Sequence, residues 1–330
     1  MLDFMRYMLP TISPFAGPGQ SFYVVDSDFQ TIWGQTDGTG LPDFYSTMAP
    51  GRVFRTGDYR DDDDAIQAAI DAAIGGRGDT VWITPGDYRV VDSIAVNKRG
   101  IRILGQPVQN PSRALVTLDG DTTAGLTDEI FNITAADVEI GFLRIIPDSG
   151  FIAFDFSAAA NRLYCHHLFF DMETPAISAQ TRGLVAIGAA ANCLFEEIWW
   201  KSDGAQGSGL VTAGLLDSVI RKCYFFCRQS VNTTGIWASP WDVGAAVNGV
   251  IGEDLHFITS SGGVMTRPLD GANATIAGGL KLENCRFPSE LGAAPIVPVG
   301  GFSASECTLV ECYMAGAGAG DGGTLITVIA

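Results

Sequence analysis

The feature that most constrains the fold is a strand pattern that recurs through the second half of the chain. Its units begin 24 to 31 residues apart and read DVEIGFLRII, NRLYCHHLFF, NCLFEEIWWK, DSVIRKCYFF, NGVIGEDLHF and GGLKLENCRF. Strands of constant length with loops of variable length between them are typical of a solenoid, because insertions fall in the turns. The repeat predicts a parallel β-helix in which each unit belongs to one coil. The units start at Asp137, Asn161, Asn192, Asp217, Asn248 and Gly278.

Three columns of this repeat are mostly apolar, and we expect them to face the core. Like side chains then stack about 4.8 Å apart along the axis. Lys201 does not fit its column, which indicates a slip of register at that unit. From Asn161 onward, the third position holds Leu163, Leu194, Val219, Val250 and Leu280, the eighth holds Leu168, Trp199, Tyr224, Leu255 and Cys285, and the tenth holds Phe170, Lys201, Phe226, Phe257 and Phe287.

One helix is predicted ahead of the repeats. Ile66, Ile70 and Ile74 recur at helical spacing, and two glycines follow them. The aspartates at 61–64 suit a helix N-terminus, where carboxylates cap the backbone and complement the dipole. Four consecutive carboxylates also suggest a calcium site, but the ligand spacing of an EF-hand loop is absent. We therefore favour capping, and we expect this helix to cover the first open end of the β-helix.

The chain divides into three regions. Residues 1–57 are interrupted by prolines and carry scattered aromatic side chains, so we expect this irregular region to attach to the main domain or to a partner. Residues 58–316 are predicted to form the β-helix. Residues 317–330 are predicted to be a glycine-rich tail with a terminal strand.

Charge and cysteine content narrow the classes of partner. The formal net charge of −17 argues against nucleic acid and against an anionic membrane, which both attract basic surfaces. Seven cysteines without a CxxC pair favour reduced thiols buried in the core, and neither a cofactor nor a metal is expected. The first residues do not form a secretory signal, and no apolar window is long enough to span a bilayer. We therefore expect an intracellular or virion protein.

Three stretches carry a resemblance to a known family. The chain reads DDAIQAAIDAA from Asp63, GDTVWITPGDYR from Gly78 and IRILG from Ile101. This succession resembles the entry to the pectate-lyase-like right-handed β-helix superfamily, which includes bacteriophage tailspikes and many polysaccharide-degrading enzymes. The unit GLKLENCRF from Gly279 resembles a coil of that fold. The resemblance implies an all-β, right-handed solenoid with one N-terminal capping helix, but no single activity, because the scaffold hosts lyases, hydrolases and inert spikes.

The sequence evidence for catalytic residues is weaker than the evidence for the fold. Pectate lyases combine a calcium-binding acidic cluster with an Arg base, and the repeat contains no Arg within an Asp cluster. Inverting glycosidases hold two carboxyls roughly 6.5–9.5 Å apart. In the sixth column, Glu253 and Glu283 are predicted to be stacked neighbours and form the acid pair to test. The favoured alternative is an outward ladder of solvated charges, in which Lys222 relieves repulsion between Glu197 and Glu253.

Two histidines occupy neighbouring positions of one unit. His166 stands in the sixth column and His167 follows it. Because side chains alternate between the two faces of a strand, we expect these rings to point in opposite directions, so that they do not share a metal.

The ninth column is predicted to be an outward aromatic stripe. Trp237 and Trp241 are expected to overhang it from a loop. Exposed apolar patches of this size mark contact surfaces, so three roles remain open: a platform for sugar rings, a seam between three β-helices, or a surface under a long loop. The stripe consists of Phe169, Trp200, Phe225, His256 and Arg286.

The leading functional hypothesis is a structural virion protein of a bacteriophage: a tailspike, fibre or capsid appendage. It predicts a homotrimer, attachment to other virion proteins through residues 1–57, and binding of host-surface glycan by the β-helix. The alternative is a polysaccharide-degrading enzyme, a glycoside hydrolase or lyase, on the same fold. The resemblance covers both functions, and the missing export signal favours the first.

Overall fold

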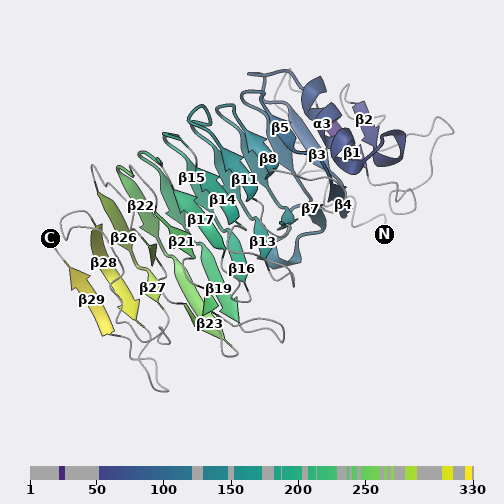
Figure 1. Cartoon of the computed structure of the whole chain (residues 1–330). Coiled ribbons are helices and arrows are strands. Elements are labelled where there is room, and N and C mark those ends of the chain that lie inside the picture. Colours follow the sequence, from purple (N-terminus) through teal and green to yellow (C-terminus); the bar gives the residue numbers. More distant parts are fainter. Residues whose placement is uncertain are drawn as a thin grey trace.

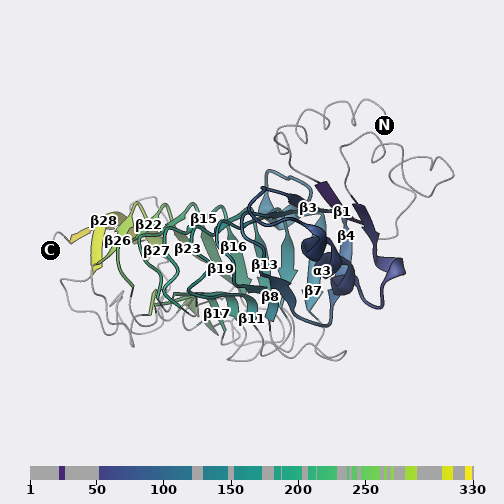
Figure 2. The same ribbon diagram turned by 90° about the horizontal axis from the view of Figure 1, so that it is seen from above.

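The protein is an elongated stack of β coils, seen from two directions in Figures 1 and 2. The computed structural model describes residues 22–26, 52–120, 129–147, 152–172, 182–186, 188–202, 207–212, 214–228, 236–237, 240–243, 247–260, 264–265, 269–270, 279–287, 307–314 and 324–328. Every strand pairing among them is parallel except the one between the last two strands. The predicted right-handed parallel β-helix is confirmed.

A long sheet forms two walls of the stack, because it is bent lengthwise. One wall contains β2 (Arg52–Arg55), β1 (Phe22–Asp26), β3 (Thr80–Ile83), β6 (Arg102–Leu104), β9 (Glu139–Gly141), β12 (Tyr164–His166), β15 (Leu194–Glu196), β18 (Val219–Arg221), β22 (Val250–Glu253) and β26 (Leu280–Glu283). The other contains β4 (Gly86–Val90), β7 (Val116–Gly120), β10 (Arg144–Ile146), β13 (Phe169–Met172), β16 (Trp199–Ser202), β19 (Tyr224–Arg228), β23 (His256–Ser260) and β27 (Arg286–Phe287). Strand β28 (Cys307–Met314) spans both walls, and β29 (Thr324–Val328) pairs antiparallel with it.

A second sheet closes the coil on the opposite side. Its strands are β5 (Ile94–Val96), β8 (Glu129–Ile133), β11 (Ile152–Phe156), β14 (Arg182–Ala186), β17 (Ser208–Thr212), β21 (Trp241–Asp242) and β25 (Leu269–Asp270). Strands β20 (Ile236–Trp237) and β24 (Val264–Met265) form a short extra pair. Two short 3-10 turns, η2 (Thr56–Asp58) and η3 (Pro111–Arg113), complete the described elements together with one α-helix, α3 (Asp62–Ala72).

From β9 and β10 onward, the long sheet bends at one residue per coil, which adopts positive φ. His167, for example, separates β12 from β13 with a φ of 49°. Its backbone N–H donates to the carbonyl of Glu196 on the next coil at 3.1 Å, so the bend is tied into the stack. The residue before such a bend and the bend residue itself both face outward, which interrupts the alternation of a simple strand. The bend column comprises Phe142, His167, Glu197, Lys222, Asp254, Asn284 and Glu311.

A second column of positive φ explains a one-residue error in the predicted register. The predicted units begin on such a residue at Asn192 and Asp217, but one residue before it at Asn161, where the positive-φ residue is Arg162. Tyr164 therefore pairs with Leu194, although Leu163 was predicted to align with it. For this reason several side chains that were predicted to face the core face outward instead. The prediction was wrong for Leu194, Trp199, Lys201, Val219, Tyr224 and Phe226.

The corrected inward column is a stack of aromatic rings. Adjacent centroids lie between 4.6 and 5.8 Å apart, and the ring planes are within 9° of parallel. Trp200 and Phe225, which were predicted to belong to the outward stripe, are fully buried members of this stack. Added Cβ atoms at Gly183 and Gly209 on the opposite sheet would approach the Trp200 indole to 2.7 and 2.9 Å, so glycine makes room for this ring. The stack runs Phe170, Trp200, Phe225, Phe257 and Phe287.

Trp237 and Trp241 also belong to the core. Both side chains are fully buried, so the prediction that they overhang the surface was wrong. The Trp237 indole donates to the carbonyl of Gly207 at 2.5 Å, and the Trp241 indole donates to Thr212 Oγ1 at 3.1 Å. Because an indole carries one polar group, a single acceptor suffices to satisfy it in the core.

Helix α3 covers the first end of the stack, as predicted (Figure 1). Ile66 and Ile70 are fully buried, whereas Ile74 lies beyond the helix and is 53% exposed, so the predicted third member of the face is wrong. The N-cap residue Asp61 makes no side-chain capping bond. Instead, Asp62 and Asp63 of the first turn accept backbone N–H groups of the β4 strand and the residue after it, at 2.8 and 3.1 Å. These aspartates therefore fasten the helix to the coil.

Parts of the N-terminal region belong to the stack itself. Strands β1 and β2 lie within residues 1–57, yet β1 pairs in parallel with both β2 and β3. Residues 1–21 and 27–51 of that region lie outside the described residues. At the other end, the hairpin of β28 and β29 puts an antiparallel strand on the last coil.

The register can be tested with two neighbouring phenylalanines. Phe225→Ala removes a ring from the buried stack, and we expect it to lower the free energy of unfolding by about 3–5 kcal/mol. Phe226→Ala, one residue further on the outer face, is expected to cost less than about 1 kcal/mol. Chemical denaturation of both variants measures the difference, and equal losses would contradict the register described here.

Candidate functional site

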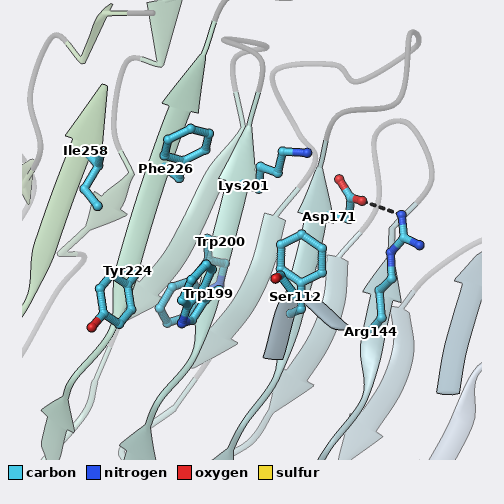
Figure 3. A pocket seen from close by; sticks show the side chains of 10 residues that line it. Ser112, Arg144, Asp171, Trp199, Trp200, Lys201, Tyr224, Phe226 and Ile258 are labelled. Carbon is cyan, nitrogen blue, oxygen red and sulfur yellow. Dashed lines mark hydrogen bonds and ion pairs between the residues drawn. The ribbon is translucent and has the colours of Figure 1, made fainter. Parts of the chain in front are cut away.

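A groove of about 600 Å³ lies on the outer face of the wall formed by β13, β16, β19 and β23 (Figure 3). Its floor is the outward column that follows the bend. Most of the lining is aromatic or aliphatic, and the charged side chains lie toward one end. The lining residues are Ser112, Arg144, Phe169, Asp171, Trp199, Trp200, Lys201, Tyr224, Phe226 and Ile258.

Trp199 and Tyr224, which are both half-buried, form the aromatic platform of this groove. Their centroids are 4.8 Å apart, and Tyr224 stacks on His256 at the same spacing with an interplanar angle of 17°. The spacing equals the distance between neighbouring coils, since the three residues are paired in register. Phe169 continues the column but is buried. An outward aromatic stripe therefore exists, with Trp199 and Tyr224 in place of the predicted Trp200 and Phe225.

The charged end of the groove is built around Arg144. Its guanidinium forms a 2.5 Å ion pair with Asp171 and lies 5.9 Å from the centroid of the Phe169 ring. Lys201 stands beside Asp171 on the neighbouring coil. Figure 3 shows these side chains along one rim of the groove. The groove thus combines aromatic faces with cationic hydrogen-bond donors.

A second hollow of about 310 Å³ adjoins the groove across the bend and shares Trp199 and Tyr224 with it. One side is the loop that contains η3, where Asn110 Oδ1 accepts the backbone N–H of Ser112 at 3.0 Å. Glu197, Lys222 and Asp254 of the bend column also line this hollow, so it is more polar than the groove. It is lined by Gln109, Asn110, Pro111, Glu197, Trp199, Lys222, Tyr224 and Asp254.

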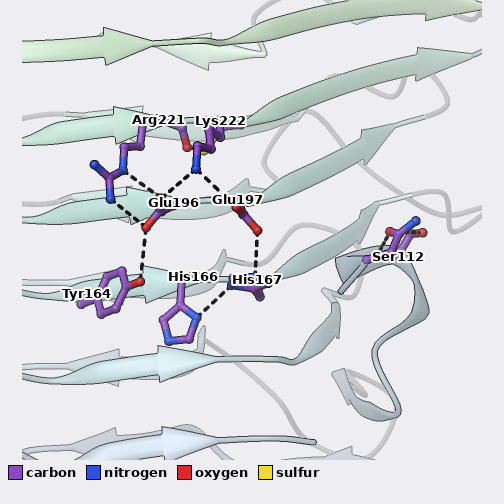
Figure 4. A network of polar contacts seen from close by, with 10 residues as sticks. Ser112, Tyr164, His166, His167, Glu196, Glu197, Arg221 and Lys222 are labelled. Atoms are coloured by element: carbon purple, nitrogen blue, oxygen red, sulfur yellow. Dashed lines mark hydrogen bonds and ion pairs between the residues drawn. The ribbon is translucent and has the colours of Figure 1, made fainter. Parts of the chain in front are cut away.

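A polar network extends from this hollow onto the neighbouring wall (Figure 4). Its centre is Glu196, which accepts two hydrogen bonds from Arg221, at 2.9 and 3.1 Å, and one from Tyr164 at 3.3 Å. Burial raises the pKa of Glu196, but the hydrogen bonds and positive charge of Arg221 and Lys222 outweigh it, so the pKa is lowered. Burial and the negative charge of Glu196 together raise the pKa of Tyr164 to about 12.

Four side chains beside this network form a continuous chain of contacts. Glu139 Oε1 lies 3.1 Å from His166 Nε2, the two Nδ1 atoms of His166 and His167 lie 3.1 Å apart, and His167 Nε2 lies 2.7 Å from Glu197 Oε2. The expectation that the two rings face opposite directions was wrong, because the bend at His167 turns its side chain outward. Burial lowers the pKa of His167.

The predicted acid pair is adjacent but lies away from both hollows. Glu253 and Glu283 are register partners on neighbouring coils, as predicted. Glu283 forms an ion pair with Lys281, and neither glutamate lines the groove or the second hollow. Their catalytic role stays a prediction. In the corrected register Arg221, not Lys222, stands between a glutamate (Glu196) and Glu253.

Of the other predicted site residues, His256 and Arg286 lie on the outward column as expected. Sequence reasoning placed Trp199, Lys201 and Tyr224 in the core and missed their role in the groove. The misfit of Lys201 was the available signal, because shifting that unit by one residue brings all three to the outer face.

The described residues contain no group of three or more His, Cys, Asp or Glu side chains arranged to hold a metal ion. Six cysteines in the described part of the chain are buried as free thiols, in agreement with the prediction of reduced core cysteines. No helix among the described residues is long and apolar enough to cross a bilayer.

The central ion pair gives a pH-dependent prediction. Arg221→Gln leaves Glu196 without its main partner, and we expect a loss of about 1 kcal/mol in the free energy of unfolding at neutral pH. Because the folded-state pKa of Glu196 is lowered, the stabilisation is present above its unfolded-state pKa and is lost as the pH falls through the folded-state value. The difference between variant and wild type should therefore shrink below about pH 4. Lys98→Gln, which removes a cation elsewhere, is the control for net charge.

Comparisons with known proteins identify the fold. No family model and no curated protein matches the chain. An alginate lyase from Paenibacillus sp. str. FPU-7 is similar with a TM-score of 0.53 at 14% identity, covering 77% of this chain and 94% of that one. Escherichia coli ybhc is similar with a TM-score of 0.51 at 11% identity, over 92% of this chain and 87% of that one. Pectin methylesterase PemA from Erwinia chrysanthemi has a TM-score of 0.46 at 12% identity, over 92% and 91%. What this chain shares with the alginate lyase and with ybhc is the fold, a right-handed parallel β-helix.

Proposed function

We propose that this protein is a polysaccharide-active β-helix protein that binds a glycan chain in the groove on its outer face. The observation that carries the proposal is the half-buried pair of Trp199 and Tyr224 on the floor of a concave site. Aromatic rings offer broad apolar faces to the C–H surfaces of sugar rings, while the tyrosine hydroxyl remains available for hydrogen bonds. The volume of the groove is in the range of sites that bind small molecules. We therefore expect it to hold a few sugar units of the chain at a time.

The rim of the groove also suits a carbohydrate. Arg144, Lys201 and Lys222 line the groove or the second hollow beside the platform, and Arg144 pairs with Asp171 while Lys222 pairs with Glu196. Such donors bind sugar hydroxyls and are better still for carboxylates, since charge-assisted hydrogen bonds are the stronger kind. The alginate lyase with the same fold is, by its name, a protein that acts on a polysaccharide. That likeness supports the scaffold as suitable for such a ligand and does not identify the sugar.

A seam between three identical chains is the less favoured use of this face. The groove is concave and polar at one end, so a threefold seam, which is heterologous, would need a different, protruding patch of the same chain to fill it. A net charge of −17 on each chain also opposes close association of three copies.

A second candidate is the bacteriophage virion appendage, a homotrimer attached to other virion proteins through residues 1–57. The observation in its favour is that β1 and β2 join this region directly to the trunk, so that a particle attached there would hold the β-helix rigidly. Glycan binding is common to both candidates, and they differ in assembly. Analytical ultracentrifugation at micromolar concentration is expected to show a trimer for the virion appendage, and a monomer contradicts it.

The glycan proposal is tested on the aromatic platform. Trp199→Ala and Tyr224→Ala each remove one stacking surface, and we expect each to weaken glycan binding by about tenfold, equivalent to roughly 1.4 kcal/mol. Affinity electrophoresis through gels that contain alginate, pectin or bacterial capsular polysaccharides measures retention of the folded protein.

The matched control is Ile74→Ala, which removes an exposed apolar side chain at the far end of the stack. It should bind as wild type does. Retention of the wild type by none of the polysaccharides, or equal retention of all three variants, contradicts the proposal.

A further inference from the structure

One coil carries a long insertion at the position where the later coils bend. From β9 onward a single residue separates the two walls, but residues 105–115 separate β6 from β7. Part of this insertion lines the second hollow together with Trp199 of β16 and Tyr224 of β19, which lie three and four strands beyond β7 on the same wall. Since neighbouring strands are about 4.8 Å apart, the loop extends along the axis by a distance on the order of 10 Å to border that hollow.

The insertion is held in a fixed shape. Pro111 is buried and begins the 3-10 turn η3, which contacts strand β10. Asn110 Oδ1 accepts the backbone N–H of Ser112 at 3.0 Å and its hydroxyl at 2.8 Å. Proline restricts φ in the first turn, and the asparagine cap satisfies an N–H that the turn leaves free. The wall that this loop gives to the second hollow is therefore preorganised, and Figure 4 shows Ser112 on the side of the bend where Glu197 and His167 lie.

The second hollow offers acceptors and donors that the described residues do not use. The Asp254 carboxylate is contacted by His256 Nε2 and by Asn284 Nδ2, at 3.3 Å each, and both contacts are made through Oδ1. Its Oδ2 has no hydrogen bond to the described residues, and the side chain is 38% exposed. In the same part of the chain, the amide of Gln109 and the Nδ2 of Asn110 also have no partner. A hydroxyl both donates and accepts hydrogen bonds, so the hydroxyls of a sugar match this mixture.

The charges of the second hollow disfavour an anionic sugar. Two carboxylates, Glu197 and Asp254, line the hollow with one ammonium, Lys222. This ammonium lies 3.5 Å from Glu196 Oε1 and 3.7 Å from Glu197 Oε1, so two glutamates already share it. A ligand carboxylate placed here would be repelled by the surplus negative charge. A hydroxyl would instead donate to a carboxylate, and hydrogen bonds to charged acceptors are the stronger kind.

Trp199 and Tyr224 connect the second hollow with the groove. Both residues line both spaces, so a glycan can pass from one to the other over them. Burial, followed by the negative charge of Asp254 and of Glu197, raises the pKa of Tyr224. Its phenol therefore keeps its hydrogen at neutral pH and can donate to a ligand. The charged side chains of the groove have the opposite balance, two cations against one carboxylate, so the two spaces favour sugar units of different charge.

We infer that the second hollow is a subsite for one uncharged sugar unit of the bound glycan, and that the inserted loop at residues 105–115 holds this unit against the aromatic platform. This inference rests on the proposed glycan binding. Asp254 Oδ2 accepts hydroxyls of the unit, and the amides of Gln109 and Asn110 bind its other polar groups. The volume of about 310 Å³ is at the lower end of small-molecule sites and suits a single unit. The preferred ligand is a neutral polysaccharide, or one in which charged and uncharged units alternate.

Affinity electrophoresis with three polysaccharides tests the charge preference. Glucomannan is uncharged, hyaluronan alternates a uronate with an uncharged N-acetyl sugar, and alginate consists of uronates alone. We expect glucomannan or hyaluronan to retain the wild type about tenfold more strongly than alginate does. Stronger retention by alginate than by both others overturns the uncharged subsite and leaves glycan binding standing. Retention by none of the three also overturns the subsite, whereas glycan binding itself is decided by the gels with pectin and capsular polysaccharides.

Asp254→Asn tests the acceptor. The variant keeps the size of the side chain, and asparagine tolerates the positive φ of 54° at this bend. Retention by the preferred polysaccharide should fall about tenfold, whereas retention by alginate should not fall, because one repelling charge is removed. A purely structural role would lower retention by every gel. Glu253→Gln, the neighbour outside both hollows, removes the same charge and should bind as wild type does. Equal retention of Asp254→Asn and wild type overturns the assignment.

Gln109→Ala tests the inserted loop. The substitution removes an amide that borders the second hollow and leaves η3 and its cap in place, so retention by the preferred polysaccharide should fall about three- to tenfold, as expected for one hydrogen bond. Arg113→Ala, at an exposed position of the same loop outside both hollows, is the matched control and should not change retention. Unchanged retention in Gln109→Ala, or an equal fall in Arg113→Ala, overturns the role of the loop.

Discussion

From β9 onward, each coil of this protein is tied to the next by a hydrogen bond from a single bend residue at positive φ. A non-glycine residue in this conformation costs about 1–2 kcal/mol, and from β9 onward the long sheet contains one such residue per coil at its bend. The N–H of each bend residue is directed at the neighbouring coil, as Lys222 donates to Glu253 at 2.9 Å. The repeated strain is therefore offset by repeated hydrogen bonds, and the bend lies at the same place in each of these coils. Both the core and the outer face depend on that alignment.

The internal aromatic stack shows how the alignment fixes the core. Trp200 lies nearly parallel to the rings above and below it, which requires its coil to be in register with both neighbours. The same indole also needs glycine opposite it, at positions 183 and 209. A larger residue at either position pushes the opposite sheet away, because protein cores are packed at nearly crystalline density. The position of the Trp200 ring in the stack therefore depends on the two glycines of the opposite sheet.

The sequence was sufficient to predict the fold, but it was not sufficient to predict which residues form the groove. The period of the repeat, the helix with Ile66 and Ile70, and the buried cysteines were all predictable, because each depends on the spacing of apolar residues. The groove depends on which of two neighbouring aromatics faces outward, as in Trp199 and Trp200. Both are tryptophan, so hydrophobicity cannot distinguish them, and one residue of register exchanges the two faces. The positive-φ residue decides the register, and it is Arg162 in one coil, Asn192 in the next and Gly249 further on. No residue type marks it.

The bend also explains why the functional groups gather where they do. A straight strand presents every second side chain to one face, so catalytic groups on it are separated by an inward residue. At the bend of this sheet two successive residues face outward, which brings His166 beside His167 and Glu196 beside Glu197. The platform begins two residues later at Trp199, close enough to share a hollow with Glu197. A dense polar network and an aromatic surface can therefore adjoin on one face without interrupting the core. For that geometric reason, the polar network around Glu196 and the aromatic platform lie close together beside the bend.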